Sequence, residues 1–224
     1  MKKNTTFLKL LMALMLLPMA HITAVGQTLT DSWEKTATDL PFIAGSGNQR
    51  GMVYGNERIY LAGREAGATM HVINAHTGEA VKMMSVEGVE ALTYALVNAE
   101  YSEDGSILAC PLTLHANIES GWGSGYFTIY RWENEDSDPE PFIVYNEKDL
   151  RLGEGLTVIG DVTDDAVIMA GASGVRTVLR WIITDGVIGD VEEITLPETV
   201  NTGIVASACP AGLTAADGFW YNNA

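Results

Sequence analysis

The sequence predicts an all-β chain built from repeated four-stranded antiparallel units, and three observations lead to this prediction. Short apolar segments rich in Val, Ile, Tyr, Phe and Trp alternate with turns rich in Gly, Asp and Asn, which is the pattern of antiparallel strands. No stretch beyond residue 26 shows a sustained helical period. A polar turn followed by a short apolar segment recurs at 55–63, 103–111, 164–171 and 216–223.

The spacing of this recurrence predicts the architecture. The apolar segments begin near Ile59, Ile107, Val167 and Phe219, at spacings of 48, 60 and 52 residues. Units of about 50 residues with four antiparallel strands are typical of β-propeller blades. A β-sandwich, the alternative, explains the strand lengths but not the repetition of one order of turns and strands. The sequence therefore predicts a β-propeller with about three and a half blades.

Each predicted blade begins with a strand before the recurring turn and continues with two strands after it. The first strands are expected at 50–55, 95–102, 156–163 and 203–210. The third strands are expected at 70–75, 126–132 and 177–183, and the fourth at 80–86, 141–146 and 192–197. The turns that join the third strands to the fourth are expected at 75–79, 133–140 and 184–190. In the first of these turns, Gly78 is free to take the positive φ that a tight hairpin requires.

These units predict a partial propeller at 27–224 that follows a leader at 1–26. Its parts are an N-terminal segment at 27–49, blades at 50–88, 89–147 and 148–198, and an incomplete blade at 199–224. Because propellers close with four to eight blades, this count predicts an N-terminal fragment of a larger ring. The alternative is that another chain, through self-association, supplies the missing blades. Residues 27–49 are a candidate for the strand that closes the last blade.

The first 26 residues carry the pattern of a secretory signal peptide. Three lysines precede or begin an apolar run at 10–19, and residues 24–26 (AVG) offer a small-x-small cleavage site. The run is too short to span a bilayer. We therefore expect a secreted or periplasmic protein that is cleaved near Gly26.

The composition is acidic, with 13 Lys and Arg against 29 Asp and Glu and a formal net charge of −16. Three of the lysines and none of the acids lie in the leader, so the charge after cleavage would be −19. Nucleic acids and anionic membranes are bound through basic patches, so we expect neither as a partner. No membrane insertion is expected after the leader is removed.

The cysteines, histidines and acidic runs do not point to a metal or cofactor. Cys110 and Cys209 both have the sequence context of buried strand residues, and a disulfide between them is left open. His71 and His76 are five residues apart and would face opposite sides of a regular strand, so we expect turn and surface histidines. The acidic run at 133–140 lacks the spacing of a calcium loop and is expected to be a solvated hairpin turn.

Two Arg-Trp pairs recur at matching positions of two predicted blades. They begin at Arg131 and Arg180. The repetition indicates a structural role, and we expect each arginine to pair with an acid of a neighbouring blade.

The loop at 117–126 (NIESGWGSGY) is the candidate ligand-binding segment. It is an insertion that makes its blade the longest. Trp122 and Tyr126 are aromatic plates that stack on sugar rings or pack against a partner protein, and the neighbouring Gly and Ser residues let the loop adapt. The alternative is a loop that folds back and buries Trp122. No nucleophile motif, P-loop or metal-spaced cysteine pair is present, so no catalytic residue is assigned.

Parts of the chain resemble known blades. The phrase IYLAGREAGATMHVINAHTGEAV resembles the blades of quinoprotein-like propellers, although Asn74 stands where an Asp is usual. Over residues 42–224, the order that includes YRWENEDSDPEPFIVY and RLGEGLTVIGD is similar to a family of secreted bacterial β-propeller domains of unassigned function. The resemblance implies a propeller fold and export, and it assigns no catalytic residue.

Taken together, the residues and the resemblance favour a binding or scaffold module for a glycan or protein ligand. The alternative is a propeller enzyme, such as a quinoprotein-like dehydrogenase, a lactonase or a polysaccharide lyase, whose site residues lie partly in missing blades. Glycan binding would distinguish a binding module from a scaffold, and a metal assay would distinguish an enzyme from both.

Overall fold

The computed structural model describes residues 32–45, 47–90, 94–117, 119, 125–199 and 205–223. Contacts divide the chain into Met1–Asp31 and Ser32–Ala224, and all described residues belong to the second unit. The predicted signal peptide therefore lies outside the described residues. Within these ranges no helix is long and apolar enough to cross a membrane.

The all-β prediction is confirmed: fifteen strands form four antiparallel sheets, and the helical segments of the described residues are two 3-10 turns, η1 (Pro41–Ile43) and η2 (Ala215–Asp217). The first sheet has the order β1 (Gln49–Gly55), β2 (Arg58–Gly63), β3 (Thr69–Asn74) and β4 (Ala80–Met83). The second has the order β5 (Tyr94–Tyr101), β6 (Ile107–Leu112), β7 (Phe127–Trp132) and β8 (Glu140–Tyr145).

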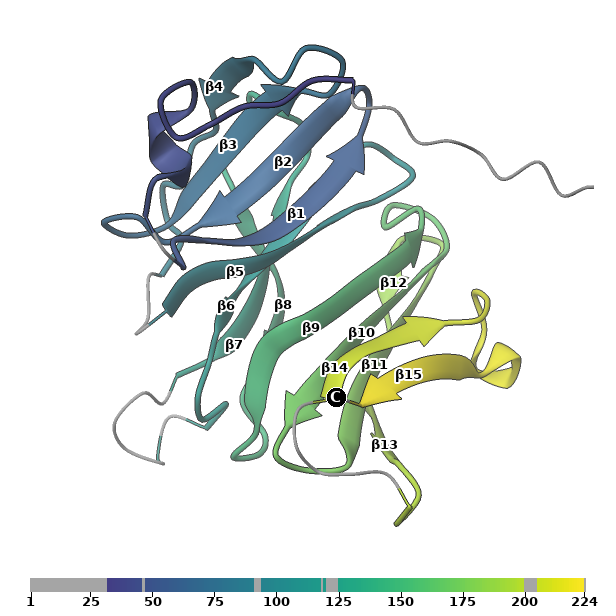
Figure 1. Ribbon diagram of the computed structural model, residues 1–224. Coiled ribbons are helices and arrows are strands. Elements are labelled where there is room, and N and C mark those ends of the chain that lie inside the picture. The colour runs from purple at the N-terminus through teal and green to yellow at the C-terminus, as the bar shows by residue number, and fades with distance from the viewer. Residues whose placement is uncertain are drawn as a thin grey trace, which may run out of the picture. The chain divides into compact units, whose positions relative to one another are not determined.

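The third sheet begins in the same way, with β9 (Arg151–Gly160), β10 (Ala166–Ser173) and β11 (Thr177–Thr184) in consecutive order. Two short strands, β12 (Val187–Ile188) and β13 (Glu192–Thr195), both pair with β11. The fourth sheet contains β14 (Val205–Pro210) and β15 (Phe219–Asn223). The meandering order of each sheet can be followed in Figure 1.

Strand β12 lies inside the segment that we expected to be only a turn, 184–190. Asp185 and Gly186 take positive φ values of 50° and 73°, and Thr184 faces Val187 across the hairpin. An Asp-Gly pair with positive φ at both positions is the preferred two-residue hairpin turn, because its twist matches that of the strands. The turn is therefore shorter than predicted, and its second half returns along β11.

The first strands of successive sheets contact one another: β1 contacts β5, β5 contacts β9, and β9 contacts β14. Glycine allows this approach at two points. A Cβ on Gly51 would lie 2.5 Å from the Asn98 Cα, and a Cβ on Gly153 would lie 2.1 Å from the Pro111 carbonyl oxygen. Both distances are far below van der Waals contact, so only a residue without a side chain fits.

The hydrophobic core consists of three clusters, each shared by two successive sheets. Tyr60 and Trp132 belong to the cluster between the first and second sheets, and Phe127 and Trp181 to the cluster between the second and third. A smaller cluster joins the third sheet to the fourth. The Trp132 indole N–H donates to the Ser85 carbonyl at 2.7 Å, so this buried ring also leaves no unpaired donor. Each sheet thus buries its faces against its neighbours in the chain.

The N-terminal segment packs on the first sheet. The Trp33 indole N–H donates to the Ala75 carbonyl at 2.8 Å, and Phe42 stacks on His71 with ring centroids 3.9 Å apart. The described residues between 32 and 48 form turns and η1 but no strand. The proposal that 27–49 supplies a ring-closing strand stays a prediction, because residues 27–31 lie outside the described residues and the strand would pair with a blade beyond those seen here.

Two residue-level expectations are also corrected. Cys110 is buried as predicted, but Cys209 is exposed, and both are free thiols. Arg131 pairs with Asp104 and Glu140, and Arg180 pairs with Glu192. Glu140 and Glu192 belong to the same sheet as the arginine they contact, and Asp104 lies in the turn between β5 and β6 of the second sheet. They do not belong to a neighbouring one, because antiparallel pairing already brings them alongside (Arg131 faces Glu140, and Arg180 faces Glu192).

Candidate ligand-binding site

The candidate loop emerges at the end of the sheets where β5, β7 and β9 begin. Its base is closed by two hydrogen bonds: the Gly125 N–H donates to the His115 carbonyl at 3.1 Å, and the Thr113 hydroxyl donates to the Tyr126 carbonyl at 3.4 Å. Thr113 also exchanges both backbone hydrogen bonds with Leu152 at the start of the third sheet. The base of the loop is therefore tied to both the second and the third sheet, with His115 on its N-terminal side and Tyr126 on its C-terminal side.

Of the two predicted ligand-binding residues, Trp122 lies outside the described residues and Tyr126 has an exposed fraction of 42%. Tyr126 borders a groove of about 180 Å³ that is also lined by Thr128 and Tyr130. Thr128 and Tyr130 are two apart on β7, so their side chains leave the strand on one face, and Tyr126 directly precedes the strand. The groove offers an aromatic plate at its rim and hydroxyl groups on its floor.

The other wall of this groove comes from the segment between β4 and β5. Its lining residues there include Gly88 and Glu90, and the Glu90 backbone N–H donates to the Tyr130 hydroxyl at 2.9 Å. Burial raises the pKa of the Tyr130 hydroxyl. On the outer side, Val144 is 55% exposed and extends the apolar rim. The groove thus combines apolar surface with one carboxylate-bearing residue and three hydroxyl-bearing residues.

A second cavity, of about 390 Å³, lies on the His115 side of the loop base. His115 Nδ1 lies 2.7 Å from the Asp149 Oδ1. Arg151 also lines this cavity and forms an ion pair with Glu154, and the Ser173 hydroxyl donates to the same carboxylate. Burial opposes the charge of Glu154, but the hydrogen bonds from Arg151 and Ser173 outweigh it and hold its pKa below the ordinary value. Sequence reasoning missed this cluster, because no local motif links its members.

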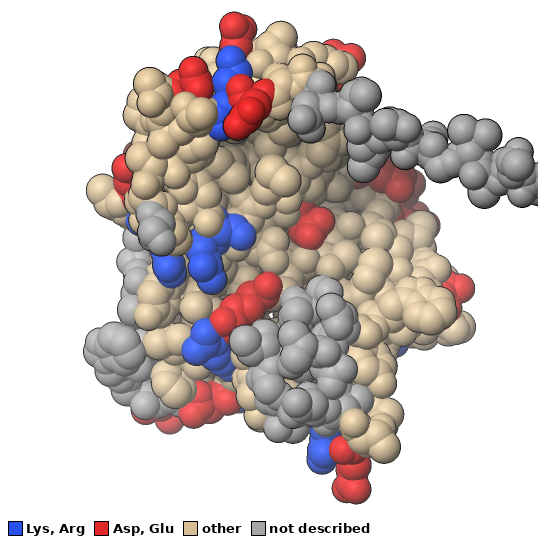
Figure 2. All heavy atoms as spheres, in the orientation of Figure 1, with Lys and Arg blue, Asp and Glu red and all other residues tan. Residues whose placement is uncertain are grey.

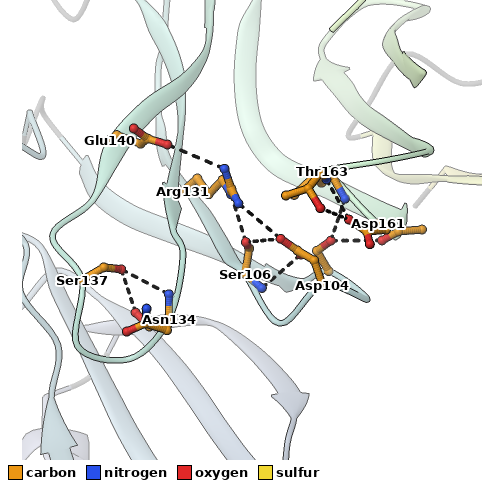
Figure 3. A network of polar contacts seen from close by, with 11 residues as sticks. Asp104, Ser106, Arg131, Asn134, Ser137, Glu140, Asp161 and Thr163 are labelled. Carbon is orange, nitrogen blue, oxygen red and sulfur yellow. Dashed lines mark hydrogen bonds and ion pairs between the residues drawn. The ribbon is translucent and has the colours of Figure 1, made fainter. Parts of the chain in front are cut away.

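The opposite end of the second sheet carries a polar network that is already paired (Figure 3). Arg131 donates to the Ser106 hydroxyl at 2.9 Å and to Asp104 at 3.3 Å, and it lies 3.7 Å from Glu140. Burial opposes the charge of Asp104, but hydrogen bonds from serine hydroxyls and the nearby guanidinium keep its pKa lowered. Since Arg131, Ser106 and Asp104 already serve as partners for one another, we interpret this network as structural.

The acidic run at 133–140 contacts the first sheet, which corrects the expectation of a purely solvated turn. Glu135 accepts a hydrogen bond from the Tyr60 hydroxyl at 2.9 Å, and Asp136 forms an ion pair with Lys82. The run does form the β7–β8 hairpin connection, as predicted. Its acids therefore join two sheets.

The histidines take different roles. His76 is exposed and lies 3.6 Å from Glu57, as expected of a turn residue. His71 is half-buried beneath Phe42, and its Nε2 makes no hydrogen bond in the described structure. Burial lowers the pKa of His71. Among the residues that the structure describes, no three His, Cys, Asp or Glu side chains gather to hold a metal ion.

Comparison with solved structures supports the fold alone. A DUF4623 family protein from Bacteroides eggerthii DSM 20697 matches with a TM-score of 0.61 and 17% identity, over 79% of this chain and 45% of that protein. This chain therefore spans less than half of that relative. Two computationally designed proteins also match: Ika8 has a TM-score of 0.43 and 10% identity, over 78% of this chain and 46% of that one. Ika4 has a TM-score of 0.45 and 11% identity, over 80% of this chain and 94% of that one.

Comparison with curated proteins finds no match. Comparison with protein families finds one that is described as a domain of unknown function, DUF8500, which matches residues 55–219. That span begins in β1 and ends at the first residue of β15, so it includes parts of all four sheets. It agrees with the predicted resemblance to a family of unassigned function, whereas the likeness to quinoprotein blades stays a prediction. Because the match extends over well more than half of the sequence, the chain belongs to the DUF8500 family.

Proposed function

We propose that this chain is an exported, non-enzymatic binding module whose sheets are successive blades of a β-propeller. Two observations support the propeller. The strands of each sheet follow one another in chain order, and the first strands of successive sheets contact one another. A propeller places the first strand of each blade nearest the central axis, where neighbouring blades meet. The predicted signal peptide supports export.

The ligand we propose is a glycan that binds at the Tyr126 groove, with Trp122 from the adjoining loop as a second contact. The observation that carries this proposal is the make-up of the groove: an exposed tyrosine at the rim and hydroxyl groups on the floor, beside the Glu90 segment. A sugar ring presents an apolar face that stacks on aromatic rings and hydroxyl groups that bond to polar side chains. The groove supplies both kinds of contact within a small space.

The test is a glycan array probed with the purified protein, followed by titration calorimetry on the glycan that binds. Tyr126→Ala and Trp122→Ala are each expected to weaken binding about three- to tenfold, as the loss of one stacking contact predicts. Tyr54→Ala is the matched control, because Tyr54 is a tyrosine with an exposed fraction of 63% on β1. It is expected to bind like the unmodified protein.

Two results would contradict the proposal. One is the absence of binding to any neutral or acidic glycan on the array. The other is glycan binding that both substitutions leave unchanged, which would place the ligand elsewhere.

A further inference from the structure

Three arginines converge at the end of the sheets where the first strands begin. Arg50 is the second residue of β1, Arg64 directly follows β2, and Arg151 is the first residue of β9. We call these three residues the arginine cluster. In Figure 2, Lys and Arg side chains gather over the beginnings of β1 and β5, on the same side as the start of β9. This concentration stands out in a chain whose formal net charge is −16.

Tyr94, the first residue of β5, lies among these arginines. The Arg64 guanidinium carbon lies 4.9 Å from the centre of the Tyr94 ring, and the Arg64 Nε–H donates to the Gly47 carbonyl at 2.9 Å. The phenol of Tyr94 is also close enough to Arg151 to contribute to the raised pKa of that guanidinium, although the main cause is the hydrogen bond to Glu154. Arg50 in turn helps to lower the pKa of Glu154 through space. The cluster is therefore arranged around one tyrosine and one carboxylate.

The positive charge of the cluster exceeds the negative charge that it meets. Glu154 pairs with Arg151 and accepts from Ser173. Arg64 contacts a carbonyl and a ring but forms no ion pair with a described acid, and Arg50 forms neither a hydrogen bond nor an ion pair with any described residue. Glu154 thus interacts with Arg151 and Arg50, and Arg64 has no acidic partner among the described residues. An anion beside these guanidinium groups would be attracted by positive charge that has no acidic partner among the described residues.

The backbone is irregular where the cluster forms. In β1 the register shifts between Gln49 and Gly51, which leaves Arg50 as the extra residue of a bulge. In β9 the register shifts again, because Ser173 faces Arg151 while Gly171 faces Gly155. Bulges re-aim side chains and are frequent beside functional sites. Two of the three arginines are therefore placed by a local departure from regular pairing.

We propose that the arginine cluster binds the anionic group, carboxylate or sulfate, of an acidic sugar. The planar guanidinium offers paired N–H donors that match the oxygens of such a group, and Tyr94 adds an aromatic ring beside it. Arg151 also borders the cavity of about 390 Å³, whose other polar lining residues are Ser173, His115 and Asp149, the last two paired with each other. This inference rests on the proposed glycan-binding function and names the chemical class of the ligand.

Two matched pairs of polymers test the inference by titration calorimetry on the full chain. Polygalacturonate is compared with its methyl ester, and dextran sulfate is compared with dextran, so each pair differs in its charge. The unmodified protein is expected to bind at least one charged member ten times or more tightly than its neutral partner. The arm that responds identifies carboxylate or sulfate as the recognised group.

Arg50→Gln is the decisive variant. The Arg50 side chain is exposed and makes no hydrogen bond to a described residue, so its replacement should not disturb folding. It is expected to weaken binding of the charged polymer roughly tenfold, as the loss of a charge-assisted hydrogen bond predicts. Arg176→Gln removes the same charge outside the cluster, where the side chain donates to the Glu198 carbonyl. It is expected to change binding less than twofold, and thermal melts check that both variants fold.

Three outcomes would overturn the inference. Equal binding of the charged and the neutral polymer of a pair would leave glycan binding intact but show that the anionic group is not recognised. Equal losses in Arg50→Gln and Arg176→Gln would indicate general attraction between charges without a site. Binding of the charged polymer that Arg50→Gln leaves unchanged would place its anionic group elsewhere. Failure of the protein to bind any of the four polymers or any arrayed glycan would instead contradict the proposed function itself.

Discussion

At the scale of single residues, the half-buried Glu100 is the most unusual acid of the described chain. It lies on β5 opposite Leu108 and forms no hydrogen bond or ion pair with a described residue. Burial raises its pKa to about 7. An unpaired carboxylate in a poorly solvated place is costly, because its charge loses hydration without gaining a partner.

This pKa predicts how stability depends on pH. The folded state holds the Glu100 proton more tightly than the unfolded state, whose carboxyl titrates near its ordinary value. The free energy of unfolding should therefore fall as the pH rises from about 4.5 to about 7, by on the order of 1 to 3 kcal/mol. Glu100→Gln should remove this fall, so the variant should match the unmodified protein at pH 4 and exceed it at pH 8.

Urea unfolding at several pH values measures the effect. Glu34→Gln, which replaces an exposed glutamate, should follow the profile of the unmodified protein. Identical profiles for Glu100→Gln and the unmodified protein would show that Glu100 is not desolvated.

At the scale of elements, the contact between the second and third sheets depends on one glycine. Gly153 has a φ of 114°, and a Cβ there would lie 2.1 Å from the Pro111 carbonyl oxygen. Gly67 has a similar φ of 124°, but a Cβ there would meet nothing within 4 Å. A side chain at either position would strain the backbone, because both φ values are positive. Only at Gly153 would it also clash with a neighbouring strand.

Gly153→Ala should therefore destabilise the protein more than Gly67→Ala. We expect a loss of about 1 to 2 kcal/mol at Gly67 from backbone strain and a loss larger by about 2 kcal/mol or more at Gly153. Chemical unfolding of both variants provides the comparison. Equal losses would mean that β9 can move away from β6 without cost.

At the scale of the whole molecule, the shared cores should make the sheets unfold together. Trp132 is fully buried, belongs to the second sheet, and donates its indole N–H to Ser85 beyond the end of the first. Trp132→Ala should cost about 3 to 5 kcal/mol, the range for truncating a buried large aromatic side chain. Because both sheets pack on this ring, hydrogen exchange should become faster in β2 and β3 as well as in β7.

Hydrogen exchange followed by mass spectrometry reads both sheets in one experiment. An increase confined to β7 and its own sheet would show that the sheets are independently stable. Val187→Ala is a suitable control, because Val187 is 69% exposed on β12 and should change neither sheet.

The sequence by itself determined the strands, their order and most of their connections. Alternating apolar residues, together with turn residues such as Gly78, act through local backbone preferences, which the sequence expresses directly. Even the missed strand β12 carried a local signal, the Asp185-Gly186 turn. Tyr126 was chosen as a ligand-binding candidate from its place beside a Gly-rich loop; the structure shows that it is exposed, and its binding of a ligand stays a prediction.

Only the tertiary structure decided which distant residues meet. Arg50 and Arg151 are about 100 positions apart in the sequence, and no local pattern connects them. They approach because β1, β5 and β9 contact one another in turn, and because glycines at Gly51 and Gly153 allow backbones to come close. The pairing of Arg131 within its own sheet and the exposure of Cys209 were likewise settled by packing. Local propensities act within a few residues, whereas burial and charge pairing depend on the whole fold, so the sites emerge only once the sheets are assembled.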